Sequence, residues 1–401
     1  MTERLYYNDS FVREFDAQVL SCDQEGERWR VILDRTAFYP TSGGQPHDLG
    51  VLGGAPVIEV ADAEEKVVHY TSAPVKLGPA HGEIDWARRI DHMQQHTGQH
   101  LLSAAFIELF SFQTVSFHLG REVSTIDLAA PSIVPRHVEE AERRTNEIIF
   151  DDRVVAVRYG TAEKLAEAGI RKQVDREGIL RAVEVEGFDR QPCGGTHLAR
   201  TGQAGMLLTR KLERRRDSWR LEFVGGFRAL STARTDYATL TQAACLLSCG
   251  LLEVPPGLAK MIEERRAQHS AVKRLEERLA KHEARSLLAA HQPLSPDAPR
   301  VIATVIVTVL DDASPEYLRL LAATLVAEGK VIALLASRSS GHVALAQTKG
   351  LAAGDMGGVL REALKQFKGK GGGAADFAQG SLADAGQADQ FLARTRDLLA
   401  I

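Results

Sequence analysis

The sequence predicts an α+β protein made of four successive regions. With 401 residues, the chain is long enough for two or three domains with ample cores. Short alternating apolar runs dominate residues 1–88, whereas helical periodicity mixes with strands farther along. We therefore expect a small β-barrel over residues 1–88, an α+β domain over 89–235, a helical linker with coiled-coil character over 236–295 and a small α/β domain over 296–401.

The composition is that of a soluble globular protein. Hydrophobic residues make up 44% of the chain and charged residues 25%. The sequence starts without a signal-peptide pattern and has no apolar stretch of membrane-spanning length, so we expect a cytoplasmic protein with no membrane partner. Its four cysteines show no framework of spaced pairs, which agrees with a reducing compartment.

Charge is unevenly distributed along the chain. The net charge of −4 gives no sign of a generally basic nucleic-acid binder. Residues 1–88 carry 8 Lys/Arg against 15 Asp/Glu, whereas residues 205–225 carry 6 against 3. Any contact with nucleic acid is therefore expected in the later part of the chain.

The first region reads as a barrel with one glycine-rich loop. Residues 17–20, 29–33 and 66–70 alternate in polarity and are separated by Gly, Asp and Pro turn signals. Residues 41–45, Thr-Ser-Gly-Gly-Gln, follow the aromatic pair Phe38-Tyr39. Taken by itself, this loop is a tight turn over an aromatic plug.

The second region begins with a histidine-rich helix. Apolar residues recur at helical spacing over residues 91–110, and Asp91 is the expected N-cap. His96 and His100 are at i and i+4 and so project from one face, where two imidazoles can hold one metal ion. His92 lies one turn earlier, so spacing alone leaves the binding pair open. A lone HxxxH pair on a helix is more often the polar edge of a packed face.

A second group of metal-ligand type follows a β-rich run. Strands are predicted at residues 114–119 and 123–128, followed by a helix that begins near Pro135. A strand at 154–159, a short helix near Thr161 and a strand at 180–185 come next. The loop that follows contains Cys193 and His197 around two glycines, which allow a tight turn. Two His from a helix with one Cys and one His from a loop form a nitrogen/sulfur set that favours Zn²⁺.

A basic hairpin is predicted at residues 206–212 and 219–224. Its cations cluster around the turn: Arg210, Lys211, Arg214, Arg215 and Arg216. Such a cluster is suited to phosphate contact, although a charged turn is often only solvated.

Two helices are expected next, over residues 228–252 and 258–290, with a boundary at residues 255–257. The second helix has a partial apolar stripe made of Leu258, Ile262, Val272, Leu275 and Leu279. Arg265 and His269 interrupt its heptad pattern, so the helix is either a connector or a dimer-forming element. Residues 291–296 read as a linker.

The last hundred residues form a small α/β domain. The pattern predicts a helix from Ser314, another over 356–367 and a closing one, with strands at 301–310, 331–336 and 342–347. A glycine run at 368–373 carries Lys368 and Lys370, and its amides could cradle phosphate oxygens; the alternative is a flexible turn. The region lacks a GxxxxGK[ST] sequence, so nucleotide hydrolysis is not indicated.

Three motifs resemble the editing domain of alanyl-tRNA synthetases and its free-standing relatives, the AlaX-type trans-editing proteins. They are FYPTSGGQPHDLG at 38–50, QHTGQHLL at 95–102 and CGGTH at 193–197, in the same order as in that family. Residues 371–380, GGGAADFAQG, resemble the glycine-rich end of the C-terminal domain of alanyl-tRNA synthetases. In the synthetases that domain is implicated in tRNA binding and dimerisation, so the resemblance also allows a homodimer through the helical linker or the C-terminal domain.

The resemblance implies a zinc-dependent hydrolase that deacylates tRNA(Ala) mischarged with serine, or also with glycine. It implies that Zn²⁺ is held by His96, His100, Cys193 and His197. The loop with Gly43 and Gly44 would overhang the zinc pocket, with the Thr41 hydroxyl recognising that of serine. His118 would belong to the pocket wall, although one histidine on a strand is usually structural. The basic hairpin, Lys368 and Lys370 would contact the tRNA.

Several alternatives stay open. The chain opens almost directly with the barrel, so we expect a stand-alone editing enzyme without ATP chemistry. A rival is an enzyme that edits another mischarged tRNA, such as seryl-tRNA(Thr). A second alternative is a non-catalytic tRNA-binding protein with a structural zinc. A third, a metal-independent esterase, is not supported, because the sequence has no GxSxG motif. The sequence identifies no general base.

Overall fold

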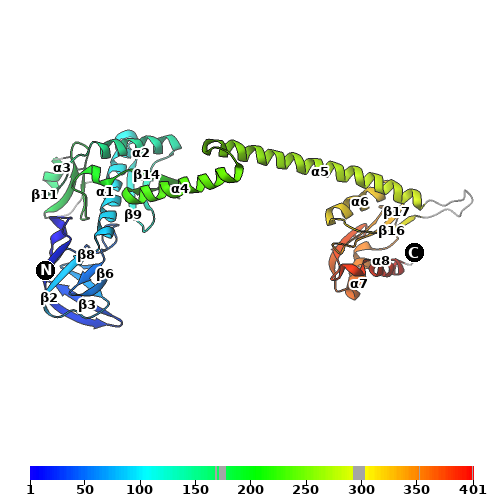
Figure 1. Cartoon of the computed structure of the whole chain (residues 1–401), viewed down its shortest axis with the longest axis horizontal. Helices are drawn as coiled ribbons and strands as arrows, with labels where there is room; N and C mark the ends of the chain where they lie inside the picture. The colour runs from blue at the N-terminus through cyan, green and yellow to red at the C-terminus, as the bar shows by residue number, and fades with distance from the viewer. Residues whose placement is uncertain (168, 171–177, 292–302, 352, 400) are drawn as a thin grey trace, which may run out of the picture. The chain divides into compact units, whose positions relative to one another are not determined.

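The computed structural model describes residues 1–167, 169–170, 178–291, 303–351, 353–399 and 401. The chain divides into two compact units, Met1–Leu246 and Leu247–Ile401 (Figure 1). Both units mix helices with sheets, as the sequence predicts. No single helix among the described residues is long and apolar enough to cross a membrane; Gly226–Leu247 and Leu251–Ala290 meet that criterion only jointly, by length and composition.

The first unit begins with a closed barrel. Its strands are β2 (Glu14–Glu25), β3 (Arg28–Leu33), β5 (Gly50–Leu52), β6 (Ala55–Ala63), β7 (Lys66–Thr71) and β8 (Gly78–Ile84), in the order β2-β3-β7-β6-β5-β8. Alternate residues of β2, including Phe15, Ala17 and Val19, face a core that also contains Phe38. Two short strands, β1 (Glu3–Arg4) and β4 (Arg35–Thr36), pair beside the barrel.

Helix α1 (Trp86–Phe110) is the central element of the unit. Its N-cap is Asp85, whose carboxylate accepts the backbone N–H of Arg88, so the prediction of Asp91 as the N-cap is wrong. Asp91 lies one and a half turns inside the helix and forms an ion pair with Arg228. The helix is fixed to the barrel by Arg89, which is fully buried and whose Nε lies 3.1 Å from Asp48 Oδ1.

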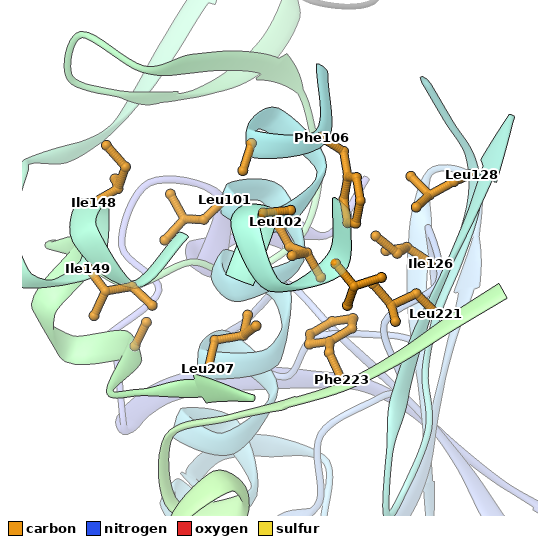
Figure 2. Packing of buried hydrophobic residues seen from close by; sticks show 14 of the residues in the cluster. Leu101, Leu102, Phe106, Ile126, Leu128, Ile148, Ile149, Leu207, Leu221 and Phe223 are labelled. Atoms are coloured by element: carbon orange, nitrogen blue, oxygen red, sulfur yellow. The ribbon is translucent and has the colours of Figure 1, made fainter. Parts of the chain in front are cut away.

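A four-stranded antiparallel sheet packs on α1. It has the order β14-β15-β10-β9 and consists of β9 (Gln113–Leu119), β10 (Ser124–Ala129), β14 (Leu207–Arg214) and β15 (Trp219–Gly225). Figure 2 shows Leu102 and Phe106 of α1 meeting residues of this sheet, among them Phe223. Helix α2 (Pro135–Phe150) adds Ile148 and Ile149 to the same core. Strands β14 and β15 confirm the predicted hairpin, and β9 and β10 confirm the strands predicted at residues 114–119 and 123–128. Helix α2 confirms the helix predicted to begin near Pro135.

A second, three-stranded sheet leads to the loop that contains Cys193. It consists of β11 (Val155–Gly160), β12 (Leu180–Val185) and β13 (Asp189–Pro192), with α3 (Ala162–Glu167) after β11. Sequence analysis missed β13 because Asp-Arg-Gln-Pro shows no apolar alternation. A 3₁₀ turn at Thr201–Ala204 precedes β14, and helix α4 (Gly226–Leu247) follows β15.

The second unit begins with the long helix α5 (Val254–Ala290), preceded by a 3₁₀ turn at Leu251–Glu253. The predicted break between two helices is confirmed, but it lies earlier than Pro255 and Pro256: α4 ends at Leu247, and the two prolines lie in the first turn of α5. Proline is tolerated there, since the first N–H groups of a helix have no intrahelical partner.

A five-stranded sheet carries helices on both faces. Its order is β16-β17-β18-β20-β19, with β16 (Thr304–Leu310), β17 (Val331–Ser337), β18 (His342–Gln347), β19 (Lys370–Gly373) and β20 (Phe377–Ser381). Strand β17 is fully buried, and its alternate residues pack against α5 and α6 (Pro315–Ala327) or against α7 (Met356–Gln366) and α8 (Ala388–Leu398). Residues 292–296 of the predicted linker and 301–302 of the predicted strand lie outside the described residues.

The glycine run of this unit forms the edge strand β19 rather than a turn. Gly371 and Gly373 are paired with Gly380 and Ala378 of β20. The alternative of a flexible turn therefore does not hold for residues 370–373, because the lack of side chains lets two backbones approach closely here: a Cβ at Gly373 would overlap Ala378.

Candidate metal centre

Four side chains of metal-ligand type converge at the centre of the first unit. They are His96 and His100 of α1 and Cys193 and His197 of the loop after β13. One ligand atom from each lies within 4.8 Å of those from the others, and within the described residues this is the one such group of three or more. The Cys193 Sγ atom is 3.4 Å from His96 Nε2 and 3.3 Å from His197 Nε2. His92 is not part of the group.

The contacts of His96 determine which of its nitrogens faces the thiol. Gln45 Oε1 accepts the backbone N–H of Thr196 at 3.1 Å, which identifies this atom as the carboxamide oxygen. The same oxygen lies 2.8 Å from His96 Nδ1, so Nδ1 must carry the proton. The Nε2 lone pair is therefore directed toward Cys193, as in a metal ligand.

The other two histidines are oriented in the same way. His100 Nδ1 lies 3.6 Å from Asp189 Oδ2, and His197 Nδ1 lies 3.2 Å from Thr97 Oγ1. Metal-binding histidines usually hold their second nitrogen against such a partner, which fixes the orientation of the ring. In His96 and His197 a hydrogen-bond partner holds Nδ1 and directs Nε2 toward the thiol, whereas His100 Nδ1 makes only the longer contact with Asp189.

Burial and mutual attraction set the protonation of the centre. Burial alone would raise the pKa of the Cys193 thiol, but the imidazoles of His96 and His197 outweigh it and hold that pKa well below its ordinary value. Burial, together with the neighbouring His96, holds the pKa of His197 well below its ordinary value. Burial opposes the charged form of His100, yet Asp189 and Cys193 raise its pKa to about 9. The centre therefore favours a thiolate, the form that binds metals.

The loop with Cys193 can pass close to α1 because of one glycine. A Cβ at Gly195 would overlap the imidazole ring of His96. The Gly195 N–H donates to Cys193 Sγ at 3.4 Å, and Arg181 Nη1 donates to the Cys193 carbonyl at 2.6 Å. These contacts hold the thiol in position.

A cavity of about 470 Å³ opens beside the four side chains. His100 and Cys193 contribute to its wall. The remaining lining residues come from the barrel loop, α1, β9 and the end of β13: Tyr39, Ser42, Gly43, Gly44, Gln99, Thr114, Val115, Ser116, Phe117, Gln191, Pro192, Gly194 and Gly195. The cavity is therefore built by elements that lie far apart in the sequence.

The predicted glycine loop reaches this cavity through Gly43 and Gly44 but not through Thr41. Gly44 has φ +81°, and a Cβ there would lie 2.8 Å from the ring of Phe117. Thr41 is exposed, and its hydroxyl lies 2.9 Å from His47 Nδ1. Its neighbour Ser42 lines the cavity instead.

His118 also lies outside the cavity lining. It is exposed and alternates with Phe117 along β9, so the two side chains leave opposite faces of the strand. Phe117 packs against the His96 ring, with ring centroids 5.4 Å apart. The structure thus brings Phe117 to the centre where the sequence singled out His118.

The basic hairpin cations are largely engaged by nearby acids. Arg210 pairs with Asp236, and both Lys211 and Arg215 pair with Glu213. Arg214 lies over the Trp219 ring, 5.1 Å from its centroid, whereas Arg216 has no ion pair with the described residues. In the second unit, Lys368 has φ +49° and Lys370 begins β19.

Sequence reasoning missed the glutamines and the aspartate of the site. Gln45 and Gln99 lie inside recognised motifs, yet nothing in the spacing indicates their contacts. Asp189 and Gln191 belong to β13, which carries no apolar pattern. Gln45 and Asp189 contact histidines that lie 51 and 89 residues away, and local periodicity does not reveal such contacts.

Two family models match the chain. Residues 303–400 match the DHHA1 domain, and residues 180–220 match the threonyl and alanyl tRNA synthetase second additional domain. The second match includes Cys193 and His197.

Full-length relatives are similar over most of the chain. The chain is 30% identical over 395 residues to alanyl-tRNA editing protein AlaX-L of Pyrococcus horikoshii, covering 95% of this chain and 94% of the relative. It is 32% identical over 259 residues to alanyl-tRNA editing protein Aarsd1 of Danio rerio, covering 60% of this chain and 63% of the relative. Alanine–tRNA ligase of Pyrococcus abyssi is 29% identical over 412 residues, covering 97% of this chain and 43% of that protein. Among solved structures, the C-Ala domain of Aquifex aeolicus alanyl-tRNA synthetase is 31% identical over 23% of this chain and 90% of that domain, with a TM-score of 0.20.

Proposed function

The chain belongs to the family of alanyl-tRNA editing proteins of the long AlaX form, and from this premise we propose that it hydrolyses the aminoacyl ester of mischarged tRNA(Ala). The substrates are seryl-tRNA(Ala) and, as a second one, glycyl-tRNA(Ala). One observation carries the proposal: a group of three histidines and one cysteine lies beside a cavity of about 470 Å³, a size suited to an aminoacyl group.

The metal of the centre is Zn²⁺ in this proposal. Three imidazole nitrogens and one thiolate are the donor set that zinc prefers, and the low pKa of Cys193 supplies the thiolate without a large cost. Bound there, Zn²⁺ would supply a Lewis acid that polarises a carbonyl or lowers the pKa of a water. Gln45, Thr97 and Asp189 keep the three Nε2 atoms directed at it.

Selectivity for serine needs a polar group that only the serine hydroxyl can satisfy. Alanine and serine differ by that hydroxyl, and a polar group left unpaired by alanine disfavours alanyl-tRNA. The barrel loop is the proposed source of this group, through Thr41 or through Ser42, which lies at the cavity.

Deacylation assays with metal analysis test the proposal. We expect wild type to hydrolyse seryl-tRNA(Ala) faster than alanyl-tRNA(Ala) and seryl-tRNA(Thr), with one zinc per chain. Cys193→Ala should lose both zinc and activity, whereas the matched control Cys245→Ala, an exposed cysteine, should retain both. Stoichiometric zinc without turnover would instead support a non-catalytic tRNA-binding protein.

The basic hairpin and the second unit provide the proposed tRNA contacts. Arg214 and Arg216 are the hairpin cations that form no ion pair with a described acid, so they are the most available for contact with phosphate. The neighbouring cations Arg210, Lys211 and Arg215 add positive charge around them. Arg214→Glu/Arg216→Glu should raise KM and leave zinc content unchanged. Lys368→Glu/Lys370→Glu tests the second unit in the same way, and Lys260→Glu, on the exposed face of α5, is the control.

A homodimer through α5 is proposed as the assembled form. The stripe predicted from the sequence is exposed in the single chain: Leu258, Ile262, Val272, Leu275 and Leu279 are each between 45% and 59% exposed. A helix face of this kind is stabilised when a second helix covers it.

A further inference from the structure

Two glutamines of the cavity have side-chain oxygens without a hydrogen-bond partner among the described residues. Gln99 lies on α1 directly before His100, and Gln191 lies on β13 two residues before Cys193. The Oε1 atoms of both are buried. Native proteins leave few buried polar atoms unsatisfied, so two acceptors in the lining of one cavity require an explanation.

The remaining contacts of Gln99 orient its carboxamide. Its Nε2 donates to Ser103 Oγ at 2.8 Å, and Ser103 Oγ also accepts the hydroxyl of Thr114 at 2.7 Å. These contacts occupy the donor end of the side chain, which is only 4% exposed, and leave the oxygen end unoccupied. Gln191 is held in β13 by pairing with Val183, so both glutamines belong to rigid elements.

A third glutamine shows what a purely structural role looks like here. Gln95 also lies on α1 directly before a cluster histidine. Its Oε1 accepts the Gly225 N–H at 2.9 Å, and its Nε2 donates to the Gly225 carbonyl at 3.0 Å. Both ends of this carboxamide are satisfied by the fold, in contrast to Gln99.

We propose that Gln99 and Gln191 form the subsite for the α-ammonium group of the aminoacyl ester. This inference rests on the proposed function. An ammonium group has three N–H donors and no acceptor, so it complements two carboxamide oxygens. Both side chains line the cavity, and because Ser103 holds the donor end of Gln99, its Oε1 is the end left for a ligand.

The subsite has a chemical consequence for substrate choice. A protonated amine has no lone pair, so an ammonium held by Gln99 and Gln191 does not compete for the metal. An N-acylated aminoacyl group has lost the charge and all but one of the donors. The enzyme should therefore act on free aminoacyl-tRNA and spare tRNA whose amino acid is N-acylated, as peptidyl-tRNA is.

The test compares seryl-tRNA(Ala) with N-acetylseryl-tRNA(Ala). We expect wild type to prefer the free amine by about 100-fold in kcat/KM, as two charge-assisted hydrogen bonds imply. Gln99→Met and Gln191→Met each remove an acceptor at nearly constant volume and should reduce that preference about tenfold. Gln99→Glu and Gln191→Glu keep an acceptor and should retain the preference for the free amine. These two variants keep the inference testable if a methionine variant fails to fold.

Gln95→Met is the matched control. It should lower Tm, because it breaks two hydrogen bonds to Gly225, while the preference for the free amine stays as in wild type. The inference is overturned if wild type hydrolyses both substrates equally, or if both methionine variants keep the full preference. Failure of wild type to hydrolyse either substrate would instead overturn the proposed function.

Discussion

Gln45 belongs to the barrel, yet its side chain is held by residues of the metal centre. It contacts both His96, 51 positions away in sequence, and Thr196, 151 positions away, and it is fully buried. A single carboxamide therefore fixes both the tautomer of one imidazole and the backbone of the loop that contains Cys193.

Removing that carboxamide should weaken metal binding. In Gln45→Leu, His96 Nδ1 and the Thr196 N–H lose their acceptor, so we expect zinc affinity to fall about 10- to 100-fold. Competition with a chromophoric chelator measures this. Gln24→Leu, at an exposed glutamine of the same barrel, is the control. Unchanged affinity in Gln45→Leu would show that the loop holds the centre without it.

Two neighbouring hydroxyls compete for the role of serine recognition. Thr41 is implied by the family resemblance but is hydrogen-bonded to His47, whereas Ser42 lines the cavity. If the Ser42 hydroxyl binds the hydroxyl of the substrate serine, Ser42→Ala should reduce the preference for seryl- over alanyl-tRNA about tenfold. Thr41→Val should then leave this preference unchanged. The opposite result would assign recognition to Thr41 and would require the loop to rearrange when substrate binds. Zinc content should be unchanged in both variants.

At the scale of elements, the barrel contains a buried histidine that makes its stability depend on pH. His69 of β7 is fully buried, and its Nε2 lies 2.8 Å from Thr36 Oγ1. Burial lowers its pKa to about 4, against an ordinary value of 6.5. The unfolded chain therefore binds a proton that the folded chain excludes, and stability is lost as pH falls from about 6.5 to about 4.

This loss should amount to at most about 3 kcal/mol for His69. Urea unfolding followed through Trp29, on the neighbouring strand β3, measures it at pH 7 and pH 4.5. The stability difference between wild type and His69→Leu should shrink at the lower pH. His81→Gln, at an exposed histidine of β8, should leave that part of the pH dependence intact. A difference that is constant with pH would contradict the assignment.

Helix α5 carries the prediction of dimerisation. Leu275 is 59% exposed and is the most exposed member of the apolar stripe, so Leu275→Lys would place one charge from each chain into the interface. We expect the dimer Kd to rise about 100-fold, measured by sedimentation. Leu252→Lys changes an equally apolar residue that is 93% exposed and off the helix, and it should have no effect. A wild-type monomer at micromolar concentration would exclude this interface.

At the scale of the whole molecule, sequence patterns identified helices and strands better than they identified which residues come into contact. Helices α1 and α2 and the hairpin β14–β15 were predictable because their apolar residues repeat at the period of the element. Strands β5 and β13 were not predictable, since β5 has only three residues and β13 lacks apolar alternation. Motif resemblance pointed to the four cluster residues, but neither periodicity nor motif could reveal that Asp189 lies beside His100 or that Gln191 lines the cavity.

The division into two units gives a prediction for unfolding. The metal centre and its core lie within Met1–Leu246, whereas the cores around α6 and α7 lie within Leu247–Ile401. A ligand stabilises only the unit that binds it, and zinc at about 1,000 times its Kd contributes about 4 kcal/mol. Calorimetry should therefore show two transitions, of which a chelator lowers one and leaves the other in place. Cys193→Ala should reproduce the chelator effect and respond no further to it, whereas Cys245→Ala should behave as wild type. A single transition that the chelator lowers as a whole would show instead that the two units unfold as one.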